Sequence, residues 1–334
     1  MLQECTKQLI EGRDLSEAEA QKSLEMILNA ETADTAIASF LTALAIKGES
    51  PAEVAGFVRV MRKQAVLVHS SHSRLIDTAG TGGGADTFNI STAAAFVIAG
   101  AGVPVAKHGN RAMTSRSGSA DVLVSLGVKI ETSPQVAERS LHEIGLAFFF
   151  APLFHPSMKR VVQIRRELGH RTIFNLLGPL TNPASAPYQI IGVYAPELTE
   201  KIGRALATLG CQRAWVVHSQ DGLDELSIGA PSRICQVVES SVETLELDPR
   251  ELGFERAPSS EFPGGTPDEN ARLIRSILEG QAKGPARDVV VLNAAAALHL
   301  VDRDDFSDAI GKAQESLDSG AALKKLRELV EAYA

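Results

Sequence analysis

The stretch GTGGGADTFNIST, residues 80–92, has four glycines in its first five positions. A tight turn needs only one or two residues able to adopt positive φ, so this density indicates that something approaches the backbone closely. The glycines lead through Asn89 into Ser91 and Thr92, where a helix of small residues is predicted to begin. The free N–H groups, the hydroxyl groups and the helix dipole at such a start favour binding of a phosphate or diphosphate.

Other phosphate-binding patterns fit this loop poorly. It reads G-x-G-x-x-A from Gly80 to Ala85, but no helix is predicted directly after it, and the next predicted strand ends in Lys107 rather than in an acidic residue. No Gly-Lys-Ser/Thr follows, so the loop is not a Walker A loop. A dinucleotide-binding dehydrogenase is therefore the least favoured function.

A second group of polar residues lies in AKHGNRAMTSRSGSADV, residues 106–122. A predicted strand delivers four of them to one rim of the sheet: Lys107, His108, Asn110 and Arg111. Residues 117–119 open another predicted helix. Two helix starts together with Lys107 and Arg111 suit a strongly anionic ligand, whereas the single histidine is assigned no more than an orienting function.

The stretch RRELGHRTIFNLLGPLTNPA, residues 165–184, places arginines beside a turn-rich apolar segment. An arginine in that position can hold a carboxylate through two parallel hydrogen bonds. A salt-bridged surface arginine is the commoner outcome when such a stretch is considered alone.

Acidic residues follow a predicted strand in VVHSQDGLDELSIG, residues 216–229, which contains Asp221, Asp224 and Glu225. Mg²⁺ is often held by one or two such carboxylates together with substrate phosphates. A solvated Asp-Gly turn is the ordinary interpretation of this loop alone. Combined with two anion-binding helix starts and a lysine, the pair predicts a magnesium–diphosphate site.

The elements that position these residues fall into two groups. From Glu4 to Ala65 the apolar residues recur at helical spacing, which predicts a small unit of about four helices. Ser16 before EAEA and Ser50 before Pro51 supply helix starts. So short a bundle needs a surface to pack against, either the rest of the chain or a second copy.

After residue 70 short apolar strands alternate with helices, which predicts a mainly parallel central sheet flanked by helices. Strands are expected at residues 75–78, 103–106, 128–130, 146–150, 189–194, 214–218 and 234–238, and helices at 92–101, 120–126 and 134–144. A long surface loop is expected at 256–270. The predicted fold class is α/β, with a small all-helical domain and a larger α/β domain. Ligands of such sheets bind at the carboxyl ends of the strands.

Composition excludes several classes of function. The chain has 334 residues, a formal net charge of −8 and 44% hydrophobic residues, so no basic footprint indicates nucleic acid or an anionic membrane. The longest apolar stretches are shorter than the ~20 residues of a membrane span. The charged start is unlike a signal or transit peptide, and three widely spaced cysteines are interpreted as structural in a reducing compartment. We expect a cytoplasmic protein.

The chain resembles the anthranilate phosphoribosyltransferase family of tryptophan biosynthesis across nearly its whole length. The motifs that carry the resemblance are GTGG at 80–83, NIST at 89–92, KHGNR at 107–111, SGSADVL at 117–123, RTIFNLLGPLTNP at 171–183 and DGLDE at 221–225. The resemblance implies a helical domain over residues 1–70, completed by about 155–185, and an α/β domain over 71–334 outside that segment. It also implies a homodimer formed through the helical parts.

The resemblance further implies which residues bind which ligand. 5-Phosphoribosyl 1-diphosphate would lie between the domains on Gly80, Thr81, Gly82, Gly83, Thr87, Asn89, Ser91, Thr92, Lys107 and Ser119. Anthranilate would contact His108, Asn110, Arg165, Gly178 and Pro179, with Arg165 addressing its carboxylate. Mg²⁺ would be held by Asp224 and Glu225, with Ser91 as an additional ligand.

The chain departs from the family pattern in the glycine loop. The family usually reads GTGGD, whereas this chain has Gly84 at the acidic position and a connection to NIST that is one residue shorter. Asp86 is a candidate replacement for the missing acid, and Val124 stands where the family has a glutamate. These changes bear on metal affinity and turnover more than on substrate class.

The predicted reaction is transfer of the phosphoribosyl group from 5-phosphoribosyl 1-diphosphate to the amine of anthranilate, giving N-(5-phosphoribosyl)anthranilate and diphosphate. One alternative is a pyrimidine nucleoside phosphorylase of the same fold, which the KHGNR and DGLDE motifs disfavour. Another is a non-catalytic relative that binds nucleic acid, which the net charge and the intact Lys107, Asp224 and Glu225 disfavour.

Overall fold

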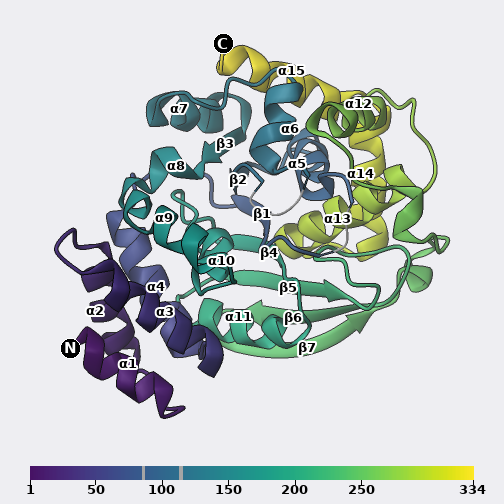
Figure 1. Cartoon of the computed structure of the whole chain (residues 1–334). Helices are drawn as coiled ribbons and strands as arrows, with labels where there is room; N and C mark the ends of the chain where they lie inside the picture. The colour runs from purple at the N-terminus through teal and green to yellow at the C-terminus, as the bar shows by residue number, and fades with distance from the viewer. Residues whose placement is uncertain (85–86, 113–115) are drawn as a thin grey trace.

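The computed structural model describes residues 1–84, 87–112 and 116–334. Its N-terminal helices lie at one side of a central sheet, and the C-terminal helices lie over the far part of that sheet (Figure 1). No helix within these described ranges combines the length and the apolar character needed to cross a membrane.

Four helices form the N-terminal unit: α1 (Leu2–Ile10), α2 (Glu17–Leu28), α3 (Asp34–Lys47) and α4 (Pro51–Gln64). Two of them begin with capping boxes. The Ser16 hydroxyl accepts from the Glu19 N–H and Ser50 accepts from the Glu53 N–H, while both glutamates accept from the backbone of their serine. The helix starts predicted at Ser16 and Ser50 are confirmed.

Later helices share the core of this unit. These are α9 (Lys159–Leu168) and α10 (Phe174–Leu177), which follow α8 (Ala151–Phe154) and the 3-10 turn η1 (Pro156–Met158). The ring of Phe57 on α4 lies 6.3 Å from that of Phe174 on α10, and Ile164 of α9 belongs to the same cluster. We propose that residues 1–70 and about 155–185 form one domain and that the rest of 71–334 forms the other.

Seven strands form one sheet: β1 (Ile76–Gly80), β2 (Val105–Gly109), β3 (Leu146–Phe150), β4 (Tyr188–Gly192), β5 (Arg213–Ser219), β6 (Ser232–Val238) and β7 (Ser241–Leu247). Their order is β3-β2-β1-β4-β5-β6-β7. The first five are parallel, and β6 and β7 continue the sheet antiparallel. The mainly parallel sheet predicted from the sequence is confirmed.

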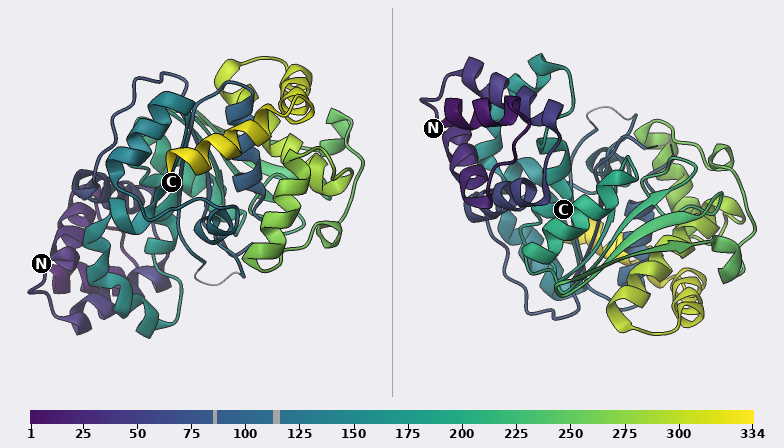
Figure 2. Two further views of the ribbon diagram at one scale, coloured as in Figure 1. Left: turned by 90° about the horizontal axis from the view of Figure 1, so that it is seen from above. Right: turned by 90° about the horizontal axis from the view of Figure 1, so that it is seen from below.

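Helices cover both faces of the sheet, and alternate strand residues face the two cores. Ile190 and Trp215 pack in one core, whereas their neighbours Ile191 and Val216 pack in the other. The first face carries α5 (Ile90–Gly100), α13 (Pro285–Asp302), α14 (Phe306–Asp318) and α15 (Ala321–Ala332), with α15 lying across α5 (Figure 2). The second face carries α11 (Glu197–Thr208) and the N-terminal unit.

The remaining elements are α6 (Ser119–Ser125), α7 (Pro134–Ile144), α12 (Pro267–Leu278) and the 3-10 turns η2 (Gly178–Leu180), η3 (Pro249–Leu252) and η4 (Ser259–Glu261). Within the stretch 256–270, expected to be a loop, α12 already begins at Pro267 because Thr266 caps it with a capping box.

Two predictions about strands were wrong. Residues 128–130 form no strand, because the Val128 N–H bonds back to Leu123 of the preceding helix and the segment then enters the start of α7 at Ser133. The edge strand β7 was missed, since its alternating, largely exposed residues resemble a polar connector.

Candidate functional site

The carboxyl ends of β1 and β2 meet the first turn of α5 and the loop after β5. Lys107, only 4% exposed, donates from Nζ to the Thr78 carbonyl at 2.6 Å and to the Ser91 hydroxyl at 3.2 Å. The Ser91 N–H in turn donates to Oε1 of Glu225 at 3.1 Å. Residues from four separate elements thus join one polar chain at the edge of the sheet.

The positive and negative charges in and around this hydrogen-bonded series do not fully balance. Burial lowers the pKa of Lys107, although the charges of Asp77 and Glu225 oppose that effect. Burial and the charge of Asp224 raise the pKa of Glu225 to about 7, while Lys107 and Ser91 act in the opposite direction. Burial also raises the pKa of Asp224. A further cation beside the two carboxylates is therefore favourable.

The donor set fits Mg²⁺ bound together with substrate oxygens. Asp224 and Glu225 supply hard carboxylate oxygens, and Ser91 supplies a hydroxyl next to them. Within residues 1–84, 87–112 and 116–334, no three His, Cys, Asp or Glu side chains gather into a metal centre. The remaining ligands would come from water or from phosphate oxygens.

Asp224 lies directly against glycines of two elements. A Cβ atom on Gly84 would overlap the Asp224 carboxylate and come within 2.7 Å of its backbone nitrogen. A Cβ atom on Gly192, the last residue of β4, would overlap the Asp224 carbonyl oxygen. Close approach explains both glycines. Asp86, the candidate for the missing acid, lies outside the described residues.

The glycine loop is anchored on β4. The Thr81 N–H donates to the Gly192 carbonyl at 2.9 Å, and its hydroxyl accepts from the Tyr194 N–H at 3.2 Å. Gly82 and Gly83 adopt φ of +67° and +87°. Thr87 forms an isolated bridge with Pro263.

The structure does not turn every predicted diphosphate ligand toward the loop. The Asn89 side chain is occupied within the protein: Nδ2 donates to the Ser117 carbonyl and Oδ1 accepts from Asn270, both at 3.0 Å. The Thr92 hydroxyl is buried and lines a small internal cavity with Lys107 and Phe148; it has no hydrogen-bond partner among the described residues. Asn89 and Thr92 therefore build the start of α5.

Asn110 and Arg111, which the sequence placed beside Lys107, make other contacts in the structure. The Asn110 carbonyl accepts from the Ala120 N–H at 3.2 Å and from the Ser119 hydroxyl at 3.4 Å, which links β2 to the start of α6. Arg111 pairs with Asp121 and Glu131 instead of joining Lys107. The predicted cationic partnership of Lys107 with Arg111 is therefore wrong.

His108 is buried and neutral. Burial, with the charges of His155 and Lys107, lowers its pKa to about 3. Because the Gly178 carbonyl can only accept, the neutral ring carries its proton on Nδ1 and donates it to that oxygen at 3.0 Å. Its Nε2 is buried and has no partner in the part of the chain that the structure describes. That lone pair is available to a ligand donor.

Arg165 lies on α9 with its guanidinium 5.5 Å from the centre of the Phe174 ring. Burial lowers its pKa, and no carboxylate of the described residues pairs with it. Gly178 and Pro179 form the 3-10 turn η2, which His108 contacts. The residues predicted to contact anthranilate thus come from β2 and the residue that follows it, from α9 and from η2.

Sequence reasoning missed residues that hold the site from a distance. Asn293 on α13 accepts from the Leu226 N–H at 3.1 Å and donates to the Leu226 carbonyl at 2.9 Å, which fixes the loop that carries Glu225. Asn270 on α12 fixes Asn89. A single asparagine within a helical segment gives no local signal of such a contact.

Comparison with known proteins matches both parts of the chain. The family model described as "Glycosyl transferase family, helical bundle domain" matches residues 3–65, and "Glycosyl transferase family, a/b domain" matches residues 72–323. The anthranilate phosphoribosyltransferase of Desulfatibacillum aliphaticivorans is 50% identical over 99% of this chain and 98% of its own length.

Solved structures agree. The anthranilate phosphoribosyltransferase of Thermus thermophilus superposes with a TM-score of 0.93 at 41% identity, covering 98% of this chain and 99% of its own. The Saccharomyces cerevisiae enzyme in complex with PRPP and Mg superposes with a TM-score of 0.92 at 30% identity, covering 99% of this chain and 97% of its own.

Proposed function

The chain belongs to the anthranilate phosphoribosyltransferase family, and from this premise we propose how its own residues act. It is a glycosyltransferase of tryptophan biosynthesis. It transfers the phosphoribosyl group of 5-phosphoribosyl 1-diphosphate to the amine of anthranilate, with Mg²⁺ as cofactor. The polar chain from Lys107 through Ser91 to Glu225 is the observation that carries the assignment of roles.

Diphosphate binding is assigned to Lys107, Ser91, Ser119 and the glycine loop. Lys107 is a buried cation beside a helix start, which is an arrangement that stabilises negative charge where water is excluded. Asp224 and Glu225, with Ser91, would hold Mg²⁺, which when bound neutralises charge on the departing diphosphate.

The reaction is a displacement at C1 of the ribose. The anthranilate nitrogen forms the bond to C1, the bond from C1 to the diphosphate oxygen breaks, and the nitrogen then releases a proton. An arylamine is uncharged at neutral pH, so positioning of the two substrates contributes more than a strong base. The Nε2 atom of His108 is an acceptor that orients the amine.

Replacing Arg165 by alanine is expected to raise the KM for anthranilate about 10- to 100-fold, because a charge-assisted hydrogen bond to the substrate carboxylate is lost. The KM for 5-phosphoribosyl 1-diphosphate should stay within about twofold, since the Arg165 guanidinium packs over the ring of Phe174 on α10. Steady-state kinetics with each substrate varied in turn measures both constants. Equal increases would contradict the assigned role.

The activity itself is tested by following the loss of anthranilate fluorescence after addition of 5-phosphoribosyl 1-diphosphate and Mg²⁺. Metal-dependent turnover supports the proposed roles, and an assay without metal is the control. Phosphorolysis of uridine or thymidine by the same preparation, without anthranilate turnover, would instead indicate a nucleoside phosphorylase.

We further propose a homodimer formed through the N-terminal unit, with no nucleic-acid partner. Ile10 on α1 and Ile46 on α3 are 71% and 83% exposed, and these two helices pack side by side. Covering such apolar side chains favours association. Sedimentation equilibrium is expected to give twice the chain mass; a monomer at micromolar concentration would exclude a stable dimer.

A further inference from the structure

The 3-10 turn η2 is held by side chains from three other elements. Each of its three consecutive carbonyls accepts a hydrogen bond from a side chain of another element: Gly178 from His108 Nδ1 at 3.0 Å, Pro179 from Gln189 Nε2 at 3.1 Å, and Leu180 from Arg62 Nε at 2.9 Å. The donors lie on β2, β4 and α4. Because each carbonyl is held by a different donor, the turn is fixed in one orientation.

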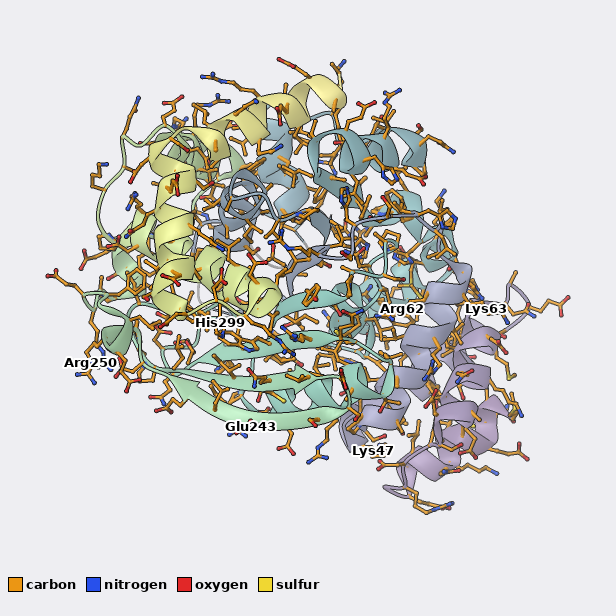
Figure 3. All side chains as sticks on the ribbon, turned by 180° about the vertical axis from the view of Figure 1, so that it is seen from behind. Lys47, Arg62, Lys63, Glu243, Arg250 and His299 are labelled. Atoms are coloured by element: carbon orange, nitrogen blue, oxygen red, sulfur yellow. The ribbon has the colours of Figure 1, made fainter. Side chains whose placement is uncertain are left out.

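Arg62, labelled in Figure 3, lies on α4 of the N-terminal unit and donates to the Leu180 carbonyl of η2. Burial lowers its pKa, and no carboxylate of the described residues pairs with it. A half-buried guanidinium is costly unless its hydrogen bonds compensate. The hydrogen bond to the Leu180 carbonyl therefore compensates part of the cost of burying the Arg62 guanidinium.

Gln189 is 2% exposed on β4. Its Oε1 lies 3.9 Å from Sγ of Cys211, which leaves the Nε2 group to face the Pro179 carbonyl. An apolar residue would suit a buried strand position better, unless the donor is needed.

Asn182, two residues after η2, is tied to the strands β1 and β2. Asn182 Nδ2 donates to Oδ2 of Asp77 at 2.8 Å and to the Ala106 carbonyl at 2.7 Å. Oδ1 of Asp77 accepts from the His108 N–H at 3.3 Å. The turn and His108 are thus held as one network, separate from the bonds that fix Ser91 and Glu225.

We propose that Arg62 and Gln189 are positioning residues for the anthranilate side of the site. They hold η2 so that Gly178, Pro179 and His108 present one geometry to the acceptor, although neither residue is placed among its contacts. This inference rests on the proposed function. Losing either donor frees one carbonyl of the turn, while the diphosphate end, built on β1 and α5, keeps its bonds.

The test compares R62M, R62K and Q189M with a control, R59M, in the full-length protein. Methionine keeps much of each side chain's length and removes the donor. Arg59 also lies on α4 and donates to a carbonyl of the α/β unit, that of Thr208 at 3.0 Å, but it does not touch η2. The control therefore measures the effect of losing a similar arginine–carbonyl hydrogen bond that does not involve η2.

R62M and Q189M are each expected to raise the KM for anthranilate about tenfold with the KM for 5-phosphoribosyl 1-diphosphate within about twofold. R62K, which keeps a donor, should recover most of the loss, and R59M should change neither constant. Equal changes in both KM values, an R59M effect like that of R62M, or unchanged kinetics in R62M and Q189M would overturn the inference.

Melting temperatures separate folding from positioning. If R62M fails to fold, Q189M carries the same test from a different element. If the wild-type protein is active and the KM values of the variants are unaltered, this inference alone is overturned. Wild-type protein that does not consume anthranilate would overturn the proposed function and, with it, this inference.

Discussion

Replacing Lys107 by methionine is expected to lower kcat/KM for 5-phosphoribosyl 1-diphosphate by about 10³-fold, as loss of a preorganised donor at a developing negative charge does elsewhere. Methionine preserves the length of the side chain but removes the ammonium group, which lies between the Thr78 carbonyl and the Ser91 hydroxyl. Among the described residues, no other lysine or arginine donates to Thr78 or Ser91. Steady-state kinetics with saturating anthranilate measures the effect.

Lys47, labelled in Figure 3, offers a matched control at the end of α3 in the N-terminal unit. Its side chain is also buried and pairs with Glu53 at 2.9 Å. K47M is expected to destabilise the protein by about 3 kcal/mol, because Glu53 keeps a buried charge without its partner, and to leave kcat/KM near the wild-type value. Lys107→Met protein that retains more than a tenth of the wild-type kcat/KM would contradict diphosphate binding by Lys107.

Replacing Glu225 by glutamine is expected to raise the Mg²⁺ concentration needed for half-maximal activity about 10- to 100-fold. Glutamine keeps an oxygen that accepts from the Ser91 N–H, so the loop stays in place while one anionic metal ligand is lost. Activity measured against Mg²⁺ at fixed substrate gives the shift. An unchanged requirement would remove Glu225 from the metal site.

The Mg²⁺ requirement is also expected to depend on pH, in a direction set by the pKa of Glu225. The pKa of Glu225 is raised to about 7, so the carboxylate is mostly protonated at pH 6 and mostly ionised at pH 8. Because only the ionised form binds metal well, the half-maximal Mg²⁺ concentration of the wild type should fall as pH rises through 7, and E225Q should lose that change. D221N is the control: Asp221 accepts from the Ser227 hydroxyl within the same loop, so its loss should leave the metal requirement unchanged.

Much of the site could be predicted because its residues follow or end strands of a parallel sheet. Lys107 is the middle residue of the short strand β2 and Glu225 follows β5, and the topology brings the carboxyl ends of these strands to one edge. The glycine loop is recognisable from its composition. The helix starts at Ser16 and Ser50 could be predicted equally well, since their capping signals lie within four residues.

What could not be predicted depends on pairs that are distant in the sequence. Arg62 and Leu180 are 118 residues apart, and Asn89 and Asn270 are 181 residues apart. Neither pair has a local pattern, and only the packed fold brings the partners together. Arg111 shows the converse: its type and position suited an anion site, but nearby acids on the surface neutralise it.

The contact between Gly84 and Asp224 also constrains how this loop can evolve. A single substitution that gives position 84 the family's usual acid would drive its Cβ atom into the Asp224 carboxylate. As long as the loop keeps this path past Asp224, position 84 is therefore expected to accept no residue larger than glycine.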